Sequence, residues 1–222
     1  MERHFDLELD TLKRMLLAMS GMVEEAINKA VTSLEKLSPE LAREVITFDK
    51  RIDRLEVEID EKTFELIVRH QPLAGDLRLI MMAAKMGTEL ERIADLAVDI
   101  AQRTLELTGQ TLIKPLVDIP KLAGLAQKMV RESIDAFVNL NGQLARSICK
   151  EDDNADFLRD LICKELTEIV IRDGKTAHRA IPLILASRHL ERICDHATNI
   201  AEDVVFLVEA KMIKHSERKK QF

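Results

Sequence analysis

Acidic residues recur four positions apart at four places in this chain of 222 residues. Residues i and i+4 lie on one face of an α-helix, so each pair places two carboxylates side by side. Grouped carboxylate oxygens suit hard cations such as Mg²⁺, Ca²⁺, Mn²⁺ or ferric iron. The candidate metal ligands are Asp49, Asp53, Glu91 and Asp95 in the first half, and Asp152, Asp156, Glu191 and Asp195 in the second.

The same acids also admit a simpler interpretation, as solvated helix faces stabilised by neighbours such as Arg92 and Arg192. Converging carboxylates repel one another and raise one another's pKa unless a cation neutralises them. Their recurrence at matching places in both halves favours the cation site. One position differs, because Asp99, the next acid along the first stripe, is replaced by Asn199 in the second half.

An internal duplication explains why the pattern appears twice. The phrase LERIADLAVDIA at residues 90–101 returns as LERICDHATNIA at residues 190–201, with eight of twelve positions identical. Farther upstream, ELAREV from Glu40 matches QLARSI from Gln143. Apolar residues at helical spacing, with few Gly and Pro, predict an all-α protein. We expect two tandem three-helix bundles, related by a pseudo-twofold axis, over residues 1–112 and 113–222.

Breakers and caps divide each half into three helices. The predicted helices run from His4 to Leu37, from Pro39 to His70, from Pro72 to Gly109, from Pro120 to Asn141, from Gly142 to Arg172, and from between Thr176 and Pro182 to Lys214. The stretch QTLIKPLVDIP between the third and fourth helices reads as a linker. The basic end KHSERKKQF is interpreted as a frayed tail, with a docking site for an acidic partner as the alternative.

Composition excludes several classes of function. A net charge of −6 argues against nucleic-acid binding, and the absence of Trp and Tyr removes the usual stacking platforms. Three cysteines without a CxxC pair indicate reduced thiols. The charged N-terminus is unlike a signal peptide, and the longest apolar run, AIPLILA, is too short to span a membrane. We therefore expect a cytoplasmic protein.

Catalytic patterns are missing from the sequence. No P-loop, GxGxxG or GxSxG occurs, and Cys and His lack zinc-type spacing. A carboxylate-bridged iron oxidase or iron-storage bundle remains the alternative function, although such bundles use Glu-x-x-His and no His follows Glu91 or Glu191 at that spacing. His178, His189 and His196 lie too far apart for one metal and are interpreted as packing or surface residues.

Three segments and the duplicated layout resemble the PhoU family of phosphate-signalling regulators. The segments are RHQPLAGDLRLI from Arg69, ELERIADLA from Glu89 and RHLERICDHATNIAEDVVFLV from Arg188. The resemblance spans nearly the whole chain. It implies a non-enzymatic homodimer that acts in the cytoplasm, peripheral to the inner membrane through its partners. It also implies an adaptor between the ATPase subunit of a phosphate ABC transporter and a sensor histidine kinase, which represses the phosphate-starvation response when phosphate is plentiful.

The resemblance also bears on cofactors and partners. It implies multinuclear iron, or Mg, Mn or Zn in its place, at the eight acids named above. It favours a partner-binding role for Asp76 and Arg78, which follow a proline break at the start of the third helix. Arg78 could offer its planar fork of donors to a partner carboxylate. The local alternative is that Asp76 complements the helix N-terminus and Arg78 pairs nearby.

Overall fold

The computed structural model describes residues 4–209, which form helices and connecting turns without any strand. The helices are α1 (His4–Lys36), α2 (Pro39–His70), α3 (Ala74–Glu106), α4 (Asp118–Val138), α5 (Gly142–Arg172) and α6 (Ala177–Glu209), with a short 3₁₀ helix η1 (Gly174–Thr176) before α6. The predicted all-α class with two three-helix bundles is confirmed. The boundary between residues 112 and 113 stays a prediction.

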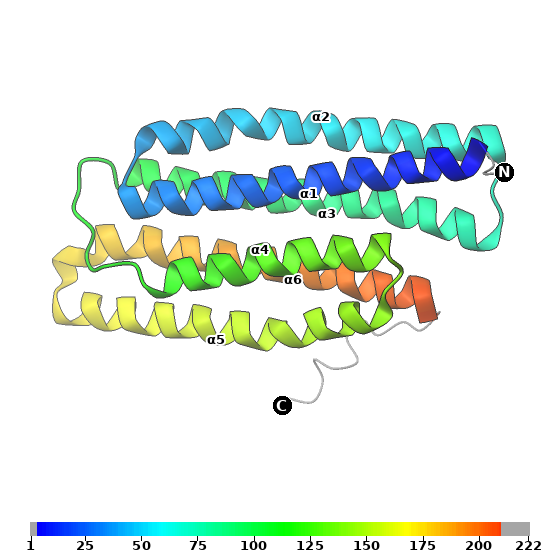
Figure 1. Cartoon of the computed structure of the whole chain (residues 1–222). Helices are drawn as coiled ribbons and strands as arrows, with labels where there is room; N and C mark the ends of the chain where they lie inside the picture. The colour runs from blue at the N-terminus through cyan, green and yellow to red at the C-terminus, as the bar shows by residue number, and fades with distance from the viewer. Residues whose placement is uncertain (1–3, 210–222) are drawn as a thin grey trace.

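The six helices lie roughly parallel to one long axis, in two groups of three (Figure 1). We call α1–α3 the first module and α4–α6 the second module. The modules meet where α3 packs against α6 and α1 packs against α4. Within the described chain, α2 packs only on α1 and α3, and α5 only on α4, α6 and η1. The two helices that carry the Asp pairs are therefore the outermost ones.

Matching turns show that the duplication extends beyond the helices. Leu37 and Leu140 end α1 and α4 at positive φ, +49° and +50°. Each is followed by a side chain that caps the next helix. Ser38 Oγ accepts from the Leu41 amide at 3.3 Å, and Asn141 Oδ1 accepts from the Leu144 amide at 3.0 Å. The turn between α1 and α2 therefore has the same construction as the turn between α4 and α5.

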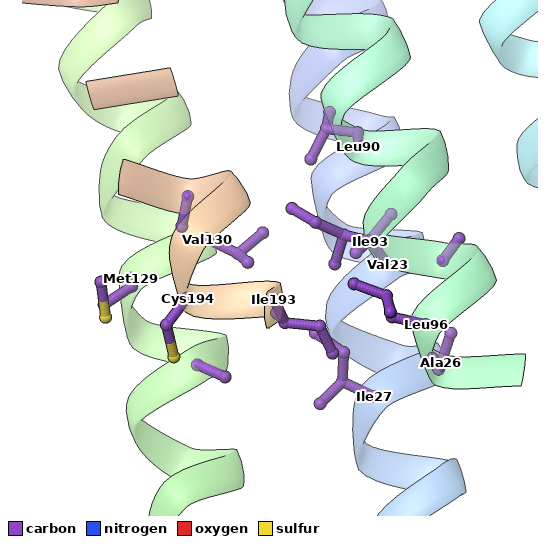
Figure 2. Packing of buried hydrophobic residues seen from close by; sticks show 14 of the residues in the cluster. Val23, Ala26, Ile27, Leu90, Ile93, Leu96, Met129, Val130, Ile193 and Cys194 are labelled. Atoms are coloured by element: carbon purple, nitrogen blue, oxygen red, sulfur yellow. The ribbon is translucent and has the colours of Figure 1, made fainter. Parts of the chain in front are cut away.

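One hydrophobic core runs through both modules. It consists mainly of aliphatic side chains, because the chain has no Trp or Tyr. Figure 2 shows Ile193 pointing from α6 toward α1 and α3, where Ile27 and Ile93 lie, whereas Cys194 points toward Met129 of α4. These side chains are fully buried or nearly so. The interface between the modules is therefore packed like a protein interior.

Most predicted helix boundaries agree with the structure to within two residues. The third and fourth helices are the exceptions, because each ends three residues early, at Glu106 rather than Gly109 and at Val138 rather than Asn141. After α3, Leu107 is buried and Gly109 turns the chain with φ +78°. The predicted extension of the sixth helix to Lys214 and the basic tail lie outside the described residues. None of the helices described is long and apolar enough to cross a membrane.

Candidate functional site

The first acidic cluster lies where α2 packs on α3. It comprises the predicted ligands Asp49, Asp53, Glu91 and Asp95. Asp49 is half-buried, and burial, followed by the charges of Asp53 and Asp95, raises its pKa to about 6. Its Oδ1 atom is buried and has no hydrogen-bond partner. Within residues 4–209, no ion pair reaches any of the four acids.

The carboxylates of the first cluster act on one another as the sequence predicts. Burial raises the pKa of Glu91, and the charges of Asp95, Glu56, Asp53 and Asp49 raise it further. Burial also raises the pKa of Asp95, as do the charges of Asp53 and Asp99. Sequence reasoning missed Glu56, which lies three positions after Asp53 on the same helix face. Of these acids, Asp49, Asp53, Glu91 and Asp95 have no ion pair with any residue that the structure describes.

The second acidic cluster lies where α5 packs on α6, and its surroundings differ. Asp156 is hydrogen-bonded to Glu191. Burial and the charge of Asp195 raise the pKa of Glu191 to about 7, although the charge of Arg159 lowers it. The Arg159 guanidinium lies 2.8 Å from Asp156 Oδ1 and 3.9 Å from Glu191 Oε1. Thr198 Oγ1 donates to Asp152 Oδ1 at 3.3 Å. This cluster therefore contains its own positively charged side chain, Arg159, and its own hydrogen-bond donor, Thr198.

The donor chemistry of the first cluster fits a hard cation better than that of the second. The first offers grouped carboxylate oxygens and an unpartnered buried one, which a cation would satisfy. Among the described residues, no three or more His, Cys, Asp or Glu side chains are already arranged to hold a metal ion. The structure thus places the predicted acids in two groups, within which their charges raise one another's pKa. Their oxygen atoms do not form a complete coordination shell for a metal ion in the part of the chain that the structure describes.

A buried polar contact between the modules escaped the sequence analysis. Glu89 of α3 is 6% exposed and contacts His196 Nδ1 of α6 at 2.7 Å. Asn199 Nδ2 donates to the same carboxylate at 3.4 Å. Burial opposes ionisation of Glu89, but the hydrogen bond and charge of His196 outweigh it and lower the pKa of Glu89. Of the two roles that the sequence left open for His196, packing or surface, the structure thus shows packing, with Glu89 as its partner.

The duplication relates this region of α3 to the matching region of α6. Positions in α3 and α6 match at an offset of 100 residues, so Glu89 matches His189 and Asp99 matches Asn199. Glu89 meets Asn199, and His189 Nδ1 lies 3.6 Å from Asp99 Oδ2. Matching positions therefore meet twice between the modules, once as a hydrogen bond and once as a longer polar approach without one.

The predicted partner-binding residues lie at the end of the molecule where α2 turns into α3. Asp76 is in the first turn of α3, and both Asp76 and Arg78 are exposed. Neither side chain has a hydrogen bond or ion pair with any described residue. The local pairing of Arg78 that the sequence left open is therefore absent from this part of the chain.

Two elongated three-helix modules, each with partly buried acids between its helices, define an all-helical scaffold. The family model described as "PhoU domain" matches residues 16–104 and again 119–204. The protein belongs to the PhoU family.

Relatives and solved structures agree along almost the full length. The phosphate-specific transport system accessory protein PhoU homologue of Aquifex aeolicus is 38% identical, over 96% of this chain and 97% of its own. The Escherichia coli accessory protein PhoU is 32% identical, over 95% and 88%. The crystal structure of PhoU from Pseudomonas aeruginosa has a TM-score of 0.89 at 37% identity, covering 94% of this chain and 100% of that one.

The electrostatics of the first cluster give a direct prediction for Asp49→Asn. The pKa of Asp49 in the folded protein, about 6, lies above its ordinary value of 3.8. The folded state therefore binds this proton more tightly than the unfolded chain, so stability is lost as the pH rises from about 4 to above 6. The whole shift corresponds to about 3 kcal/mol. Since the side chain is only half-buried, solvent screening reduces this to about 1 kcal/mol.

Asp49→Asn should accordingly stabilise the chelator-treated protein by about 1 kcal/mol at pH 8 and by much less at pH 4.5. Urea unfolding followed by circular dichroism at the two pH values measures the difference. Asp60→Asn, on the same helix, is the matched control and should change stability by less than about 0.5 kcal/mol. An equal gain at both pH values would contradict the electrostatic cause.

Proposed function

We propose that the protein is a non-catalytic regulator of phosphate transport. In this role it links the ATPase subunit of a phosphate ABC transporter to a sensor histidine kinase, and represses the phosphate-starvation response when phosphate is plentiful. The observation that carries the proposal is the match of both modules, over nearly the full length, to proteins named as phosphate-specific transport accessory proteins. The lack of a catalytic motif in the sequence fits an adaptor.

The end of the molecule around Asp76 and Arg78 supports a docking role. Large apolar side chains are exposed there on the last turns of α2 and the first turns of α3. This turn patch consists of Phe64, Val68, Leu73, Leu77 and Met81. Exposed apolar side chains beside an unpaired arginine are typical of protein interfaces. We assign the turn patch to the transporter ATPase, with Arg78 binding a carboxylate of that partner.

The proposed assembly is a homodimer in the cytoplasm, held at the inner membrane through the transporter. Its cation, iron or Mg, Mn or Zn, would be held by Asp49, Asp53, Glu91 and Asp95, where it would neutralise their mutual repulsion. The alternative, an iron oxidase or storage bundle, is favoured only by the number of grouped carboxylates. Aerobic addition of ferrous iron distinguishes the two, because sustained oxygen consumption belongs to the oxidase alone.

A phosphate-starvation reporter tests the regulatory role. Deleting the gene should raise reporter expression at least tenfold in high phosphate, and the wild-type gene should restore repression. Arg78→Ala should fail to restore it, because the partner carboxylate loses its bidentate contact. Arg172→Ala is the matched control, since Arg172 is also exposed near a helix end but at the opposite end of the molecule. Unchanged expression after deletion would overturn the proposal.

A further inference from the structure

The two acidic clusters descend from one duplicated unit, but several aligned residues differ, and three of these differences concern charge or hydrogen bonding in the first cluster. The outer helices align at an offset of 103 residues and the inner helices α3 and α6 at 100. The differing pairs are Glu56 and Arg159, Val98 and Thr198, and Asp99 and Asn199. Each of these three differences removes negative charge or adds a donor in the second module, whereas Asp160, which aligns with Val57, adds an acid there. The first cluster thus has six carboxylates, against five and a guanidinium in the second.

Arg159 lies among the acids of the second cluster. Its Nη2 is 2.8 Å from Asp156 and 3.9 Å from Glu191, and its Nη1 is 3.3 Å from Asp160. The side chain is only 25% exposed, so its charge is partly shielded from solvent. A guanidinium held by carboxylates on both α5 and α6 neutralises them as an external cation would.

The hydrogen bonds of the matching residues Asp152 and Asp49 also differ between the two clusters. Asp152 accepts a hydrogen bond from Thr198, whereas its counterpart Asp49 has a buried oxygen without a partner. The residue of α3 that matches Thr198 is Val98, which has no hydroxyl to donate. Asp49 of the first cluster therefore has a buried oxygen without the partner that its counterpart Asp152 has.

We infer that the second module carries its own counter-ion in Arg159 and takes no cation, so that the protein binds its cation in the first module alone. The inference rests on the cation binding proposed above. For a metal ion to enter the second cluster, it would have to displace the guanidinium from Asp156 and Glu191 and compete with its charge. In the first cluster, no ion pair with a described residue occupies Asp49, Asp53, Glu91 or Asp95.

Mn²⁺ titration of the chelator-treated full-length chain tests this inference by calorimetry at pH 7.5. Asp49→Asn/Asp53→Asn should lose at least 90% of the wild-type capacity for Mn²⁺. The mirror variant, Asp152→Asn/Asp156→Asn, is the matched control and should keep wild-type capacity and affinity. Arg159→Gln should add a second class of sites, because it exposes the acids of the second module.

The possible failures are distinct. Loss of about half the capacity in Asp152→Asn/Asp156→Asn would show that the second module binds metal and would overturn the inference while leaving cation binding intact. An absence of Mn²⁺ binding by the wild-type protein would overturn the cation proposal itself. Circular dichroism checks the fold of Arg159→Gln, and the two Asp→Asn pairs decide the question even if that variant is unstable.

Discussion

Replacing His196 by leucine is expected to lower the free energy of unfolding by about 3 kcal/mol at pH 7. The side chain of its partner, Glu89, is 8% exposed, and leucine leaves this carboxylate without its closest contact. Removing the partner of a buried carboxylate costs about 3–5 kcal/mol, because it leaves an uncompensated buried charge. Arg92 and Asn199, each 3.4 Å from the same carboxylate, keep the loss at the low end of that range.

The loss should depend on pH in a defined direction. The pKa of Glu89 in the folded protein lies below its ordinary value of 4.5, chiefly because the hydrogen bond to His196 outweighs burial. A lowered carboxyl pKa gives stability that is complete above pH 4.5 and is lost as the pH falls through the folded-state pKa. The difference between wild type and His196→Leu should therefore be largest at neutral pH and shrink in acid.

Urea unfolding followed by far-UV circular dichroism measures this effect, because the chain has no Trp or Tyr for fluorescence. His178→Leu is the matched control, since His178 is exposed on the same helix. Adding Glu89→Gln to His196→Leu should recover part of the loss, because it removes the stranded charge. If His178→Leu and His196→Leu cost the same, the buried pair is not the cause.

Local sequence signals predicted most helices well, because capping and helix-breaking residues mark most of the boundaries. Ser38 with Pro39 marks a helix start, and Asn141 with Gly142 a break between two helices, and both signals depend only on neighbouring residues. The end of α3 was predicted less well. Burial of Leu107 against the core decides where that helix stops, and no local pattern reveals it.

The acid pairs were predictable for the same reason, because i, i+4 spacing fixes one helix face and the duplication repeats it. The contact of Glu89 with His196 was not predictable, because it joins residues 107 positions apart and depends on how α3 meets α6. The position of Arg159 within the second cluster likewise requires α5 and α6 together. A closer comparison of the halves would have signalled it, since Arg159 aligns with Glu56.

Ile193→Ala is expected to lower the free energy of unfolding by about 3–4 kcal/mol. Ile193 is fully buried where α6 faces α1 and α3 (Figure 2). Truncating a large aliphatic side chain in a packed core removes transfer free energy and leaves a cavity, together about 2–5 kcal/mol. Ile181→Ala is the matched control, because Ile181 is on the same helix but 52% exposed. It should cost less than about 1 kcal/mol.

Ile193→Ala also tests whether the two modules fold as one unit. All three cysteines, Cys149, Cys163 and Cys194, lie on α5 and α6, so thiol labelling reports the second module alone. Circular dichroism reports helices in both. Because one core joins the modules, the two probes should give the same urea midpoint in the wild type and the same lowered midpoint in Ile193→Ala. A thiol transition that moves while part of the helical signal keeps its wild-type midpoint would mean that the modules unfold independently. The α3–α6 interface would then be a docking surface between two domains rather than the centre of one.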